Sequence, residues 1–385
     1  MFLESIKYAD FERTRREWKL EEFALDNINL IVGKNATGKT RTLNIIGALA
    51  NLLCGYIKMQ FASGNYEVTF DNNGNKIEYV LKYERSKILR EKLTINSKTR
   101  LNRTAKSTGT IYYEKEDTDL EFQIPVNELA VFTRRDSIQH AFLDDLYSWG
   151  KSVTHYRFGT TLGQDRLAVF AKAGDRQGEQ AVDLKDTHGA VVIFRKGLAE
   201  LKERFSSSII RDMGTIGYDL QHIGLAKPYG LVVHGVAMGR PIGLQVQESD
   251  LRAGTDQNIM SQGMFRALSL IIQTTYSQLT STPSCILVDD IGEGLDYERS
   301  SALLKLLVEK VKGTSIQLIM ATNDRFVMNS VPLEYWAVID RTGGKCRIYN
   351  YRNSREIFED FRLTGLNNFD FFSGKYYLEE NRHIH

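Results

Sequence analysis

The chain has 385 residues, of which 42% are hydrophobic and 25% are charged, and its formal net charge is +2. This length allows two or three domains, or one large head with an insertion, and the composition is that of an ordinary globular protein. A net charge near zero means that any nucleic-acid surface must be local. No apolar run is long enough to span a membrane and the N-terminus does not resemble a signal peptide, so we expect a cytoplasmic protein without a membrane partner.

The chain contains three cysteines, Cys54, Cys285 and Cys346. They lie far apart in the sequence and lack the spacing of metal ligands, which argues against a disulfide framework or a zinc site. We expect buried free thiols in a reducing compartment.

A glycine-rich segment near the N-terminus fits the phosphate-binding pattern G-x-x-x-x-G-K-[ST]. Its residues are Gly33, Lys34, Asn35, Ala36, Thr37, Gly38, Lys39 and Thr40, followed by Arg41. The pattern is specific because an apolar strand is predicted before it at 28–32 and a helix after it. The helix is indicated by a shared apolar face of Leu43, Ile46, Ala50 and Leu53.

The chemistry of this loop predicts a site for ATP and Mg²⁺. The glycines let backbone N–H groups turn toward phosphates, and the helix N-terminus adds a partial positive charge. Lys39 would reach the β- and γ-phosphates and contribute to catalysis, while the hydroxyl of Thr40 would ligate Mg²⁺.

The pattern then changes to the alternation of strands. Segments 66–70 and 77–83 flank the turn Asn73-Gly74, and further alternating pieces occur at 93–95 and 120–124. An antiparallel lobe is therefore predicted. Residues 151–250 read as an inserted α/β lid, with a partly helical stretch at 190–213 whose Leu198, Leu201 and Phe205 share one side, and short strands at 230–233 and 242–246.

The α/β pattern returns in the last third of the chain. A helix is predicted over 261–279, a buried strand at 286–288, a helix over 300–311 and a strand at 316–320. The strand, helix and second strand suggest a right-handed parallel unit that joins the first α/β piece in one sheet. The predicted organisation is thus an ATPase head built from residues 1–150 and 251–385, with the lid at 151–250 between them.

Two aspartates follow the buried strand at 286–288. The pattern is that of a Walker B element, in which Asp289 would hold the Mg²⁺. Asp290 would act as the general base that polarises the attacking water, although glutamate is the usual residue there and aspartate is one methylene shorter.

The segment Ser261-Gln262-Gly263 before this element and the segment Gly294-Leu295-Asp296 after it resemble the signature motif and the D-loop of the ABC-type ATPase superfamily. This resemblance implies that Ser261, Gly263 and Asp296 contact the γ-phosphate of ATP held by a second subunit. It therefore implies a homo-oligomer, a dimer of heads or larger. Taken alone, the serine motif would also fit a helix N-cap followed by a tight turn.

Two departures distinguish the chain from transporter heads of that superfamily. Asn323 stands where a histidine is usual, and it can hydrogen-bond a γ-phosphate but cannot carry a proton. No glutamine loop follows the phosphate loop, and Gln139 is only a weak candidate. With the antiparallel lobe and the lid, the chain resembles the non-transport branch that contains RecF, SMC and OLD (overcoming lysogenization defect) proteins. The short lid and the lack of coiled-coil arms favour the OLD-like ATPases, among them the ATPase subunit of the PARIS system.

This resemblance implies an oligomeric sensor or scaffold that controls a separately encoded effector, a nuclease or toxin, in prokaryotic anti-phage defence. The alternative is a RecF/SMC-like repair ATPase that binds DNA. A transporter head and a scaffold that barely turns over ATP are weaker readings. A nuclease within the chain is not expected, because the acidic pairs at 117–119 and 144–145 read as a polar turn and a helix surface.

Two surfaces are candidates for partner binding. The stretch 82–106 is basic and could contact DNA through Lys98, Arg100 and Arg103, although a solvated face is the simpler interpretation. The C-terminal segment is rich in aromatic residues, which we expect to pack on the head. His383 and His385 are expected to belong to a frayed terminus.

Overall fold

The computed structural model describes residues 1–170, 183, 185–229 and 240–378. The chain divides into two compact units. Unit 1 consists of Met1–Val153, Gln317–Asn323 and Pro332–His385, and unit 2 of Thr154–Ile316 and Asp324–Val331. Both units combine segments that are distant in the sequence.

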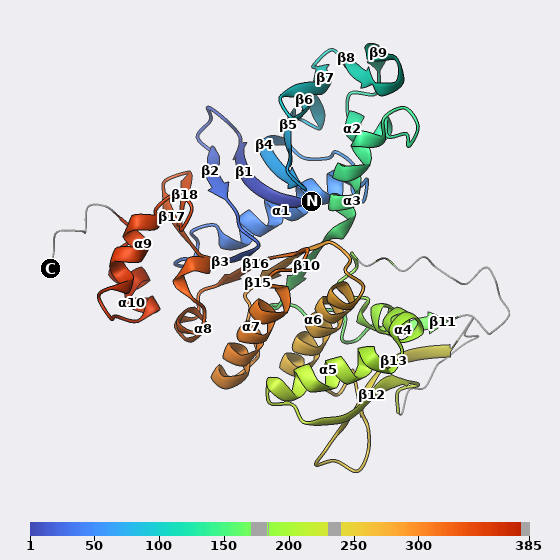
Figure 1. Ribbon diagram of the computed structural model, residues 1–385, viewed down its shortest axis with the longest axis vertical. Helices are drawn as coiled ribbons and strands as arrows, with labels where there is room; N and C mark the ends of the chain where they lie inside the picture. The colour runs from blue at the N-terminus through green and yellow to red at the C-terminus, as the bar shows by residue number, and fades with distance from the viewer. Residues whose placement is uncertain (171–182, 184, 230–239, 379–385) are drawn as a thin grey trace. The chain divides into compact units, whose positions relative to one another are not determined.

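Unit 1 is built on a long sheet with the strand order β16-β3-β17-β18-β2-β1-β4-β5-β6-β7-β8-β9 (Figure 1). Its strands are β1 (Phe2–Asp10), β2 (Trp18–Ala24), β3 (Ile28–Val32), β4 (Ser63–Asn72), β5 (Asn75–Glu84), β6 (Lys87–Ile95), β7 (Lys98–Thr104), β8 (Thr108–Tyr113), β9 (Thr118–Gln123), β16 (Ile316–Thr322), β17 (Trp336–Thr342) and β18 (Lys345–Asn350). Its helices are α1 (Lys39–Leu53), α2 (Ala130–Thr133), α3 (Asp144–Ser152), α9 (Arg355–Arg362) and α10 (Asn368–Ser373), with 3₁₀ turns η1 (Glu114–Glu116), η2 (Ala141–Leu143) and η3 (Leu333–Tyr335).

Strand β3 lies in the parallel part of this sheet. All five of its residues are buried, as expected for a strand covered on both faces. It pairs in parallel with β16 on one side and with β17 on the other. The predicted strand at 28–32 and the apolar face of the following helix are both confirmed, because Leu43, Ile46, Ala50 and Leu53 are buried in α1.

The antiparallel lobe from β4 to β9 is also confirmed. Strands β4 and β5 are joined at Asn73 and Gly74, both with positive φ, which is the geometry of a tight hairpin turn. Apolar residues alternate inward along β4 and β5, as predicted. The prediction for β9 holds only in part, because Leu120 is exposed whereas Phe122 is buried.

One residue of the predicted basic surface belongs to the core. Arg103 is fully buried, and its guanidinium lies 3.4 Å from the carboxylate of Glu91, which is also fully buried. Arg103 also donates to the main-chain oxygens of Pro125, at 2.7 Å, and of Glu128. The expectation that Arg103 contacts DNA is therefore wrong. Alternation along β7 turns this side chain inward, and the sequence did not indicate its acidic partner on β6.

Glu91 joins the sheet to helix α2. Its carboxylate accepts hydrogen bonds from the backbone N–H groups of Ala130, at 2.8 Å, and Val131, at 3.0 Å, and from the hydroxyl of Tyr79 at 3.2 Å. Burial raises the pKa of Glu91, and these donors together with Arg103 oppose that rise. The network therefore fixes the segment 125–131 against β6 and β7.

The aromatic C-terminal segment packs inward, as predicted. The buried aromatic side chains are Phe358, Phe361, Phe371, Phe372 and Tyr377. The ring of Phe371 on α10 lies 4.6 Å from the ring of Phe358 and 5.0 Å from the ring of Phe361, both on α9, measured between ring centroids. His383 and His385 lie outside the described residues.

Unit 2 contains β10 (Val153–Arg157), β11 (Ala168–Phe170), β12 (Leu220–Ala226), β13 (Arg240–Glu248), β14 (Thr255–Asp256) and β15 (Ser284–Asp289), with helices α4 (Ala190–Leu201), α5 (Glu203–Thr215), α6 (Gln262–Leu279), α7 (Tyr297–Val311) and α8 (Arg325–Ser330). Strand β10 lies beside β15, and a small sheet has the order β11-β13-β12 with β14 on β13. Helices α5, α6 and α7 pack side by side (Figure 1).

The predicted elements of the last third are confirmed as α6, β15, α7 and β16. The helical stretch at 190–213 is also present, but its predicted face is wrong in part. Leu198 and Leu201 are only half-buried, because helix α4 ends before Lys202, which has φ 53°. Phe205 is buried and belongs to the next helix, α5. The segment 242–246 lies in β13, and 230–233 lies outside the described residues.

The three cysteines are buried, as predicted. No helix in the described part of the chain is both long and apolar enough to cross a membrane. The three-part division at residues 150 and 250 stays a prediction.

The half-buried His155 on β10 makes unit 2 sensitive to acid. Burial, with Arg157 and Lys185 nearby, lowers its pKa from 6.5 to about 4. The folded chain keeps this imidazole neutral while the unfolded chain protonates it, so stability is full above pH 6.5 and is lost as pH falls to 4. The loss is about 3 kcal/mol, at about 1.4 kcal/mol per pKa unit.

We expect His155→Leu to flatten the pH dependence of the unfolding free energy between pH 6.5 and 4, measured by urea denaturation. His222→Leu, at an exposed histidine of the same unit, should keep the profile of the unmodified protein. An unchanged slope in His155→Leu would refute the assignment.

Candidate functional site

The loop between β3 and α1 is a tight turn that requires glycine at two positions. A Cβ atom at Gly33 would lie 2.7 Å from Ile339 Cγ2 and 2.9 Å from the carbonyl oxygen of Ile339. Gly38 has φ +113° and is the N-cap of α1, and a Cβ there would lie 3.1 Å from the ring of Trp18. The loop is therefore pressed against β17 and β2, and its backbone conformation depends on both glycines.

Lys39 folds back over this loop. Its ammonium donates to the carbonyl oxygens of Gly33, at 2.8 Å, and of Lys34, at 3.0 Å, and the residue is 7% exposed. The first turn of α1 holds no acidic residue. A lysine charge and a helix N-terminus thus act on the same small volume, which is the arrangement that favours a bound phosphate.

The remaining loop residues face outward or brace the turn. Lys34, Asn35, Ala36 and Thr40 are exposed, and Ala36 has φ 63°. Thr37 braces the loop, because its hydroxyl donates to the oxygen of Lys34 at 2.9 Å. An exposed hydroxyl at Thr40, the first turn of α1, suits a magnesium ligand.

Three neighbours of the loop were not found from the sequence. Arg41 pairs with Asp10 at 2.6 Å and lies 4.1 Å above the ring of Trp18. The thiol of Cys346 donates to the oxygen of Thr37 at 3.2 Å. Asp10, Trp18 and Cys346 lie on β1, β2 and β18, so only the sheet pairing could have revealed them.

Asn323 lies at the loop, as its position after a parallel strand suggests. The register of β16 and β3 pairs Thr322 with Val32, so both strands end at the same level. The amide of Asn323 then donates to the side-chain oxygen of Asn35 at 2.8 Å. Gln139 is exposed and its backbone N–H donates to Asp136, and its proposed role stays untested.

In unit 2, two aspartates end strand β15. Asp289 is buried, with 5% exposure, and its carbonyl oxygen accepts from the backbone N–H of Phe158 at 3.1 Å. Asp290 is half-buried and has φ 52°, so the chain turns sharply there.

The predicted signature and the turn after β15 meet within unit 2. Ser261 is the N-cap of α6, and its side chain accepts from the N–H of Met264 at 3.2 Å. A Cβ at Gly263 would lie 2.2 Å from the oxygen of Gly294, so glycine allows this contact. Arg266, which sequence reasoning missed, bridges the oxygens of Thr160 and Glu293.

Asp296 is the N-cap of α7. Its carboxylate accepts from the backbone N–H of Arg299, at 2.9 Å, and from the guanidinium of Arg299, at 2.7 Å. Both interactions lower the pKa of Asp296, the backbone hydrogen bond most. Unit 2 thus groups Ser261, Gly263 and Asp296 at the starts of two helices, and unit 1 groups Lys39, Asn35 and Asn323.

Comparisons with known proteins agree with this architecture. No family model matches the chain, and no protein of curated function matches its sequence. A solved SMC head bound to the C-terminal winged-helix domain of ScpA matches with a TM-score of 0.53 and 11% identity, over 90% of this chain and 97% of that one. An Smc head with an extended coiled coil, bound to the C-terminal domain of ScpA derived from Pyrococcus furiosus, also matches with a TM-score of 0.53 and 11% identity. That match covers 94% of this chain and 99% of the other.

The likeness defines the fold. The chain has the α/β fold of SMC heads, which is an ABC-type ATPase fold, and the predicted fold class is confirmed.

Proposed function

We propose that the chain binds ATP with Mg²⁺ at the loop 33–40 and hydrolyses it. The observation that carries this proposal is the ammonium of Lys39, held 2.8 Å from the oxygen of Gly33 at the N-terminus of α1. Phosphate oxygens are the natural partners of such a charge. The hydroxyl of Thr40 and the carboxylate of Asp289 are oxygen ligands of the type that Mg²⁺ prefers.

Within this proposal, Asp290 activates the attacking water. Replacing it by alanine should leave ATP binding intact and lower kcat by roughly 10²–10⁴-fold, the usual worth of a general base. Single-turnover hydrolysis and equilibrium binding of ATP measure the two quantities separately. Glu293→Ala, at an exposed acid of the same turn, is the control and should keep both near the unmodified values.

Asp290→Ala with unchanged turnover would remove Asp290 from the proposal. An unmodified protein that binds ATP without hydrolysing it would instead make the chain a nucleotide-binding scaffold.

ATP works as a switch in this proposal because a second copy completes the site. Ser261, Gly263 and Asp296 of one copy approach the γ-phosphate held by another, and Asn323 contacts the γ-phosphate within its own copy. A change from mostly open to mostly closed needs about 5.5 kcal/mol of differential affinity, and ADP lacks the group that would provide it. Light scattering with ATP and with ADP, in the presence of Mg²⁺, tests this oligomerisation.

The closed oligomer is proposed to hold or release a separately encoded effector, a nuclease or toxin, in anti-phage defence. This step rests on the resemblance of the motifs to OLD-like ATPases. Cells that carry the gene with its neighbouring gene should survive phage challenge, and Lys39→Ala should remove that protection. Protection that persists in the variant would argue against ATP as the switch.

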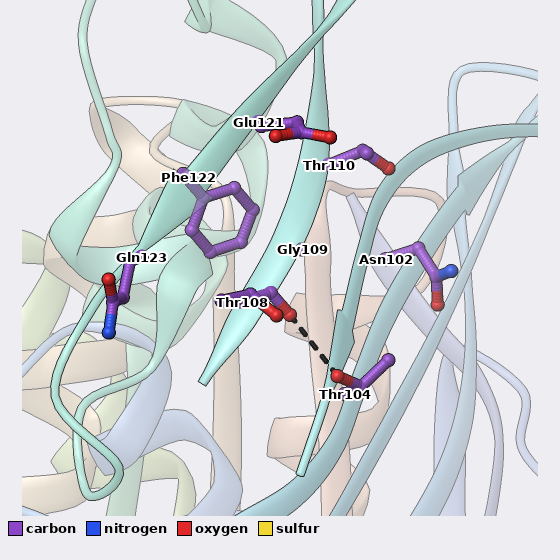
Figure 2. Close-up of a pocket in the computed structure, with 8 residues that line it drawn as sticks. All are labelled: Asn102, Thr104, Thr108, Gly109, Thr110, Glu121, Phe122 and Gln123. Carbon is purple, nitrogen blue, oxygen red and sulfur yellow. Dashed lines mark hydrogen bonds between the residues drawn. The ribbon is translucent and has the colours of Figure 1, made fainter. Parts of the chain in front are cut away.

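DNA binding in repair is the second candidate, and one observation favours it. Lys92 pairs across the sheet with Asn102, and Arg90 with Thr104, so these side chains share the outer face of β6 and β7. Lys, Arg, Asn and Thr side chains commonly contact nucleic-acid backbones. The same face continues into a groove of about 580 Å³. Figure 2 shows the residues that line it, which are Asn102, Thr104, Thr108, Gly109, Thr110, Glu121, Phe122 and Gln123.

If this face binds DNA, the double variant Arg90→Glu/Lys92→Glu should weaken binding and reduce the slope of log affinity against log salt by about 2. Fluorescence anisotropy over a salt series measures both. Lys58→Glu, an exposed lysine on the α1–β4 connection, is the control. Equal losses in both variants would indicate only a general charge effect.

A further inference from the structure

Arg299 links three separate parts of unit 2. It binds Asp296 through its backbone N–H and its guanidinium, as described above. The guanidinium also donates to the carbonyl oxygen of Gly217 at 3.3 Å, and it lies 4.5 Å above the ring of Tyr218. A single side chain thus joins the start of α7 to the turn that follows α5.

Tyr218 extends this link to α6. Burial raises the pKa of Tyr218, and Ser261, which lies near its hydroxyl, opposes that larger rise by lowering the pKa. Gly217, with φ +84°, lets the chain turn after α5, and the N–H of Tyr218 donates to the oxygen of Met213 at 2.9 Å. The ring of Tyr218 therefore has a defined place between the guanidinium of Arg299 and the N-cap of α6.

Helix α5 itself is fixed to both neighbouring helices. The ammonium of Lys310 on α7 donates to Asp212 on α5 at 2.6 Å, and both side chains are less than a tenth exposed. The hydroxyl of Thr275 on α6 donates to the same carboxylate at 3.4 Å. A buried ion pair of this kind tolerates little displacement, because either charge alone would be buried without a partner.

We propose that Arg299 and Tyr218 are positioning residues, which hold Asp296 and Ser261 in one arrangement and couple α5 to ATP turnover. The proposal rests on the proposed function, in which Ser261 and Asp296 act on the nucleotide of a second copy. Reacting groups must be placed within about 1 Å, since larger errors cost roughly 100-fold in rate. A carboxylate and a hydroxyl at the first residues of two helices need external support of this kind.

Two variants isolate the link. Tyr218→Phe keeps the ring under the guanidinium and removes only the hydroxyl that lies near Ser261. Arg299→Gln removes the guanidinium. Arg355→Gln is the matched control, because Arg355 also pairs with an acid of its own helix, Glu359 at 2.8 Å, and lies 5.4 Å above a tyrosine ring, Tyr351.

Hydrogen–deuterium exchange gives the first readout, and it does not depend on ATPase activity. Both variants should speed exchange of the backbone amides at 262–265 and 297–300 at least fivefold, while Arg355→Gln should leave these amides unchanged. Unchanged exchange in both variants would overturn the proposal, whatever the activity.

ATP turnover gives the second readout. Both variants should lower kcat about tenfold or more and leave the affinity of the loop 33–40 for ATP within twofold of the unmodified value. Faster exchange with unchanged kcat would also overturn the coupling. An unmodified protein without ATPase activity would overturn the proposed function, and the exchange data would still report on the link.

Discussion

Lys39→Ala should abolish ATP hydrolysis and weaken ATP binding. The ammonium lies against the loop carbonyls of Gly33 and Lys34. Removing a group that stabilises developing charge costs roughly 10²–10³-fold in rate, and the loss of ground-state attraction to the phosphates lowers affinity as well. We therefore expect kcat/KM to fall by at least about 10³-fold, measured by phosphate release.

Lys58→Ala, at an exposed lysine on the connection between α1 and β4, is the control for this variant. We expect kcat/KM close to that of the unmodified protein. Similar losses in Lys58→Ala and Lys39→Ala would contradict the assignment of the phosphate charge to Lys39.

Glu91→Ala should destabilise the fold by about 3–5 kcal/mol, the usual cost of leaving one charge of a buried pair without its partner. The variant leaves the guanidinium of Arg103 without its acid and frees the N–H groups of Ala130 and Val131. Urea denaturation measures the free energy of unfolding, which should fall. The conformation of the loop at 33–40 should stay the same.

The double variant Glu91→Leu/Arg103→Met should recover most of this loss, because no isolated charge stays buried. Glu78→Ala, which breaks an exposed pair with Lys76 on the same lobe, should change stability little. If Glu91→Ala behaves like Glu78→Ala, the buried network does not stabilise the lobe.

The parts of the site that could be predicted from the sequence are those encoded in short segments. The loop 33–40 carries its own strand and helix signals, and Asn323 could be placed because it follows a buried strand. Parallel strands end at one edge of a sheet, which is why Asn323 meets Asn35. Ser261 and Asp296 begin helices, as their side-chain chemistry favours.

The parts that could not be predicted depend on pairing between distant segments. Trp18 and Cys346 reach the loop from β2 and β18, which pair with each other in parallel. Arg103 looked like a surface cation because its partner Glu91 lies on the neighbouring strand. Alternation along β6 turns Glu91 inward, and alternation along β7 turns Arg103 inward. The contact between Tyr218 and Arg299 could not be predicted either, because it arises only where the turn after α5 packs against α7.

From their sequence motifs, we propose that the loop at 33–40 and Asp289 both act on a magnesium-bound nucleotide. Equilibrium binding of ATP with and without Mg²⁺ tests it most directly, in the unmodified protein and in Asp289→Asn. We expect Mg²⁺ to tighten ATP binding in the unmodified protein, and this effect to be largely lost in Asp289→Asn while binding without Mg²⁺ stays the same. An unaltered Mg²⁺ effect in Asp289→Asn would contradict the account.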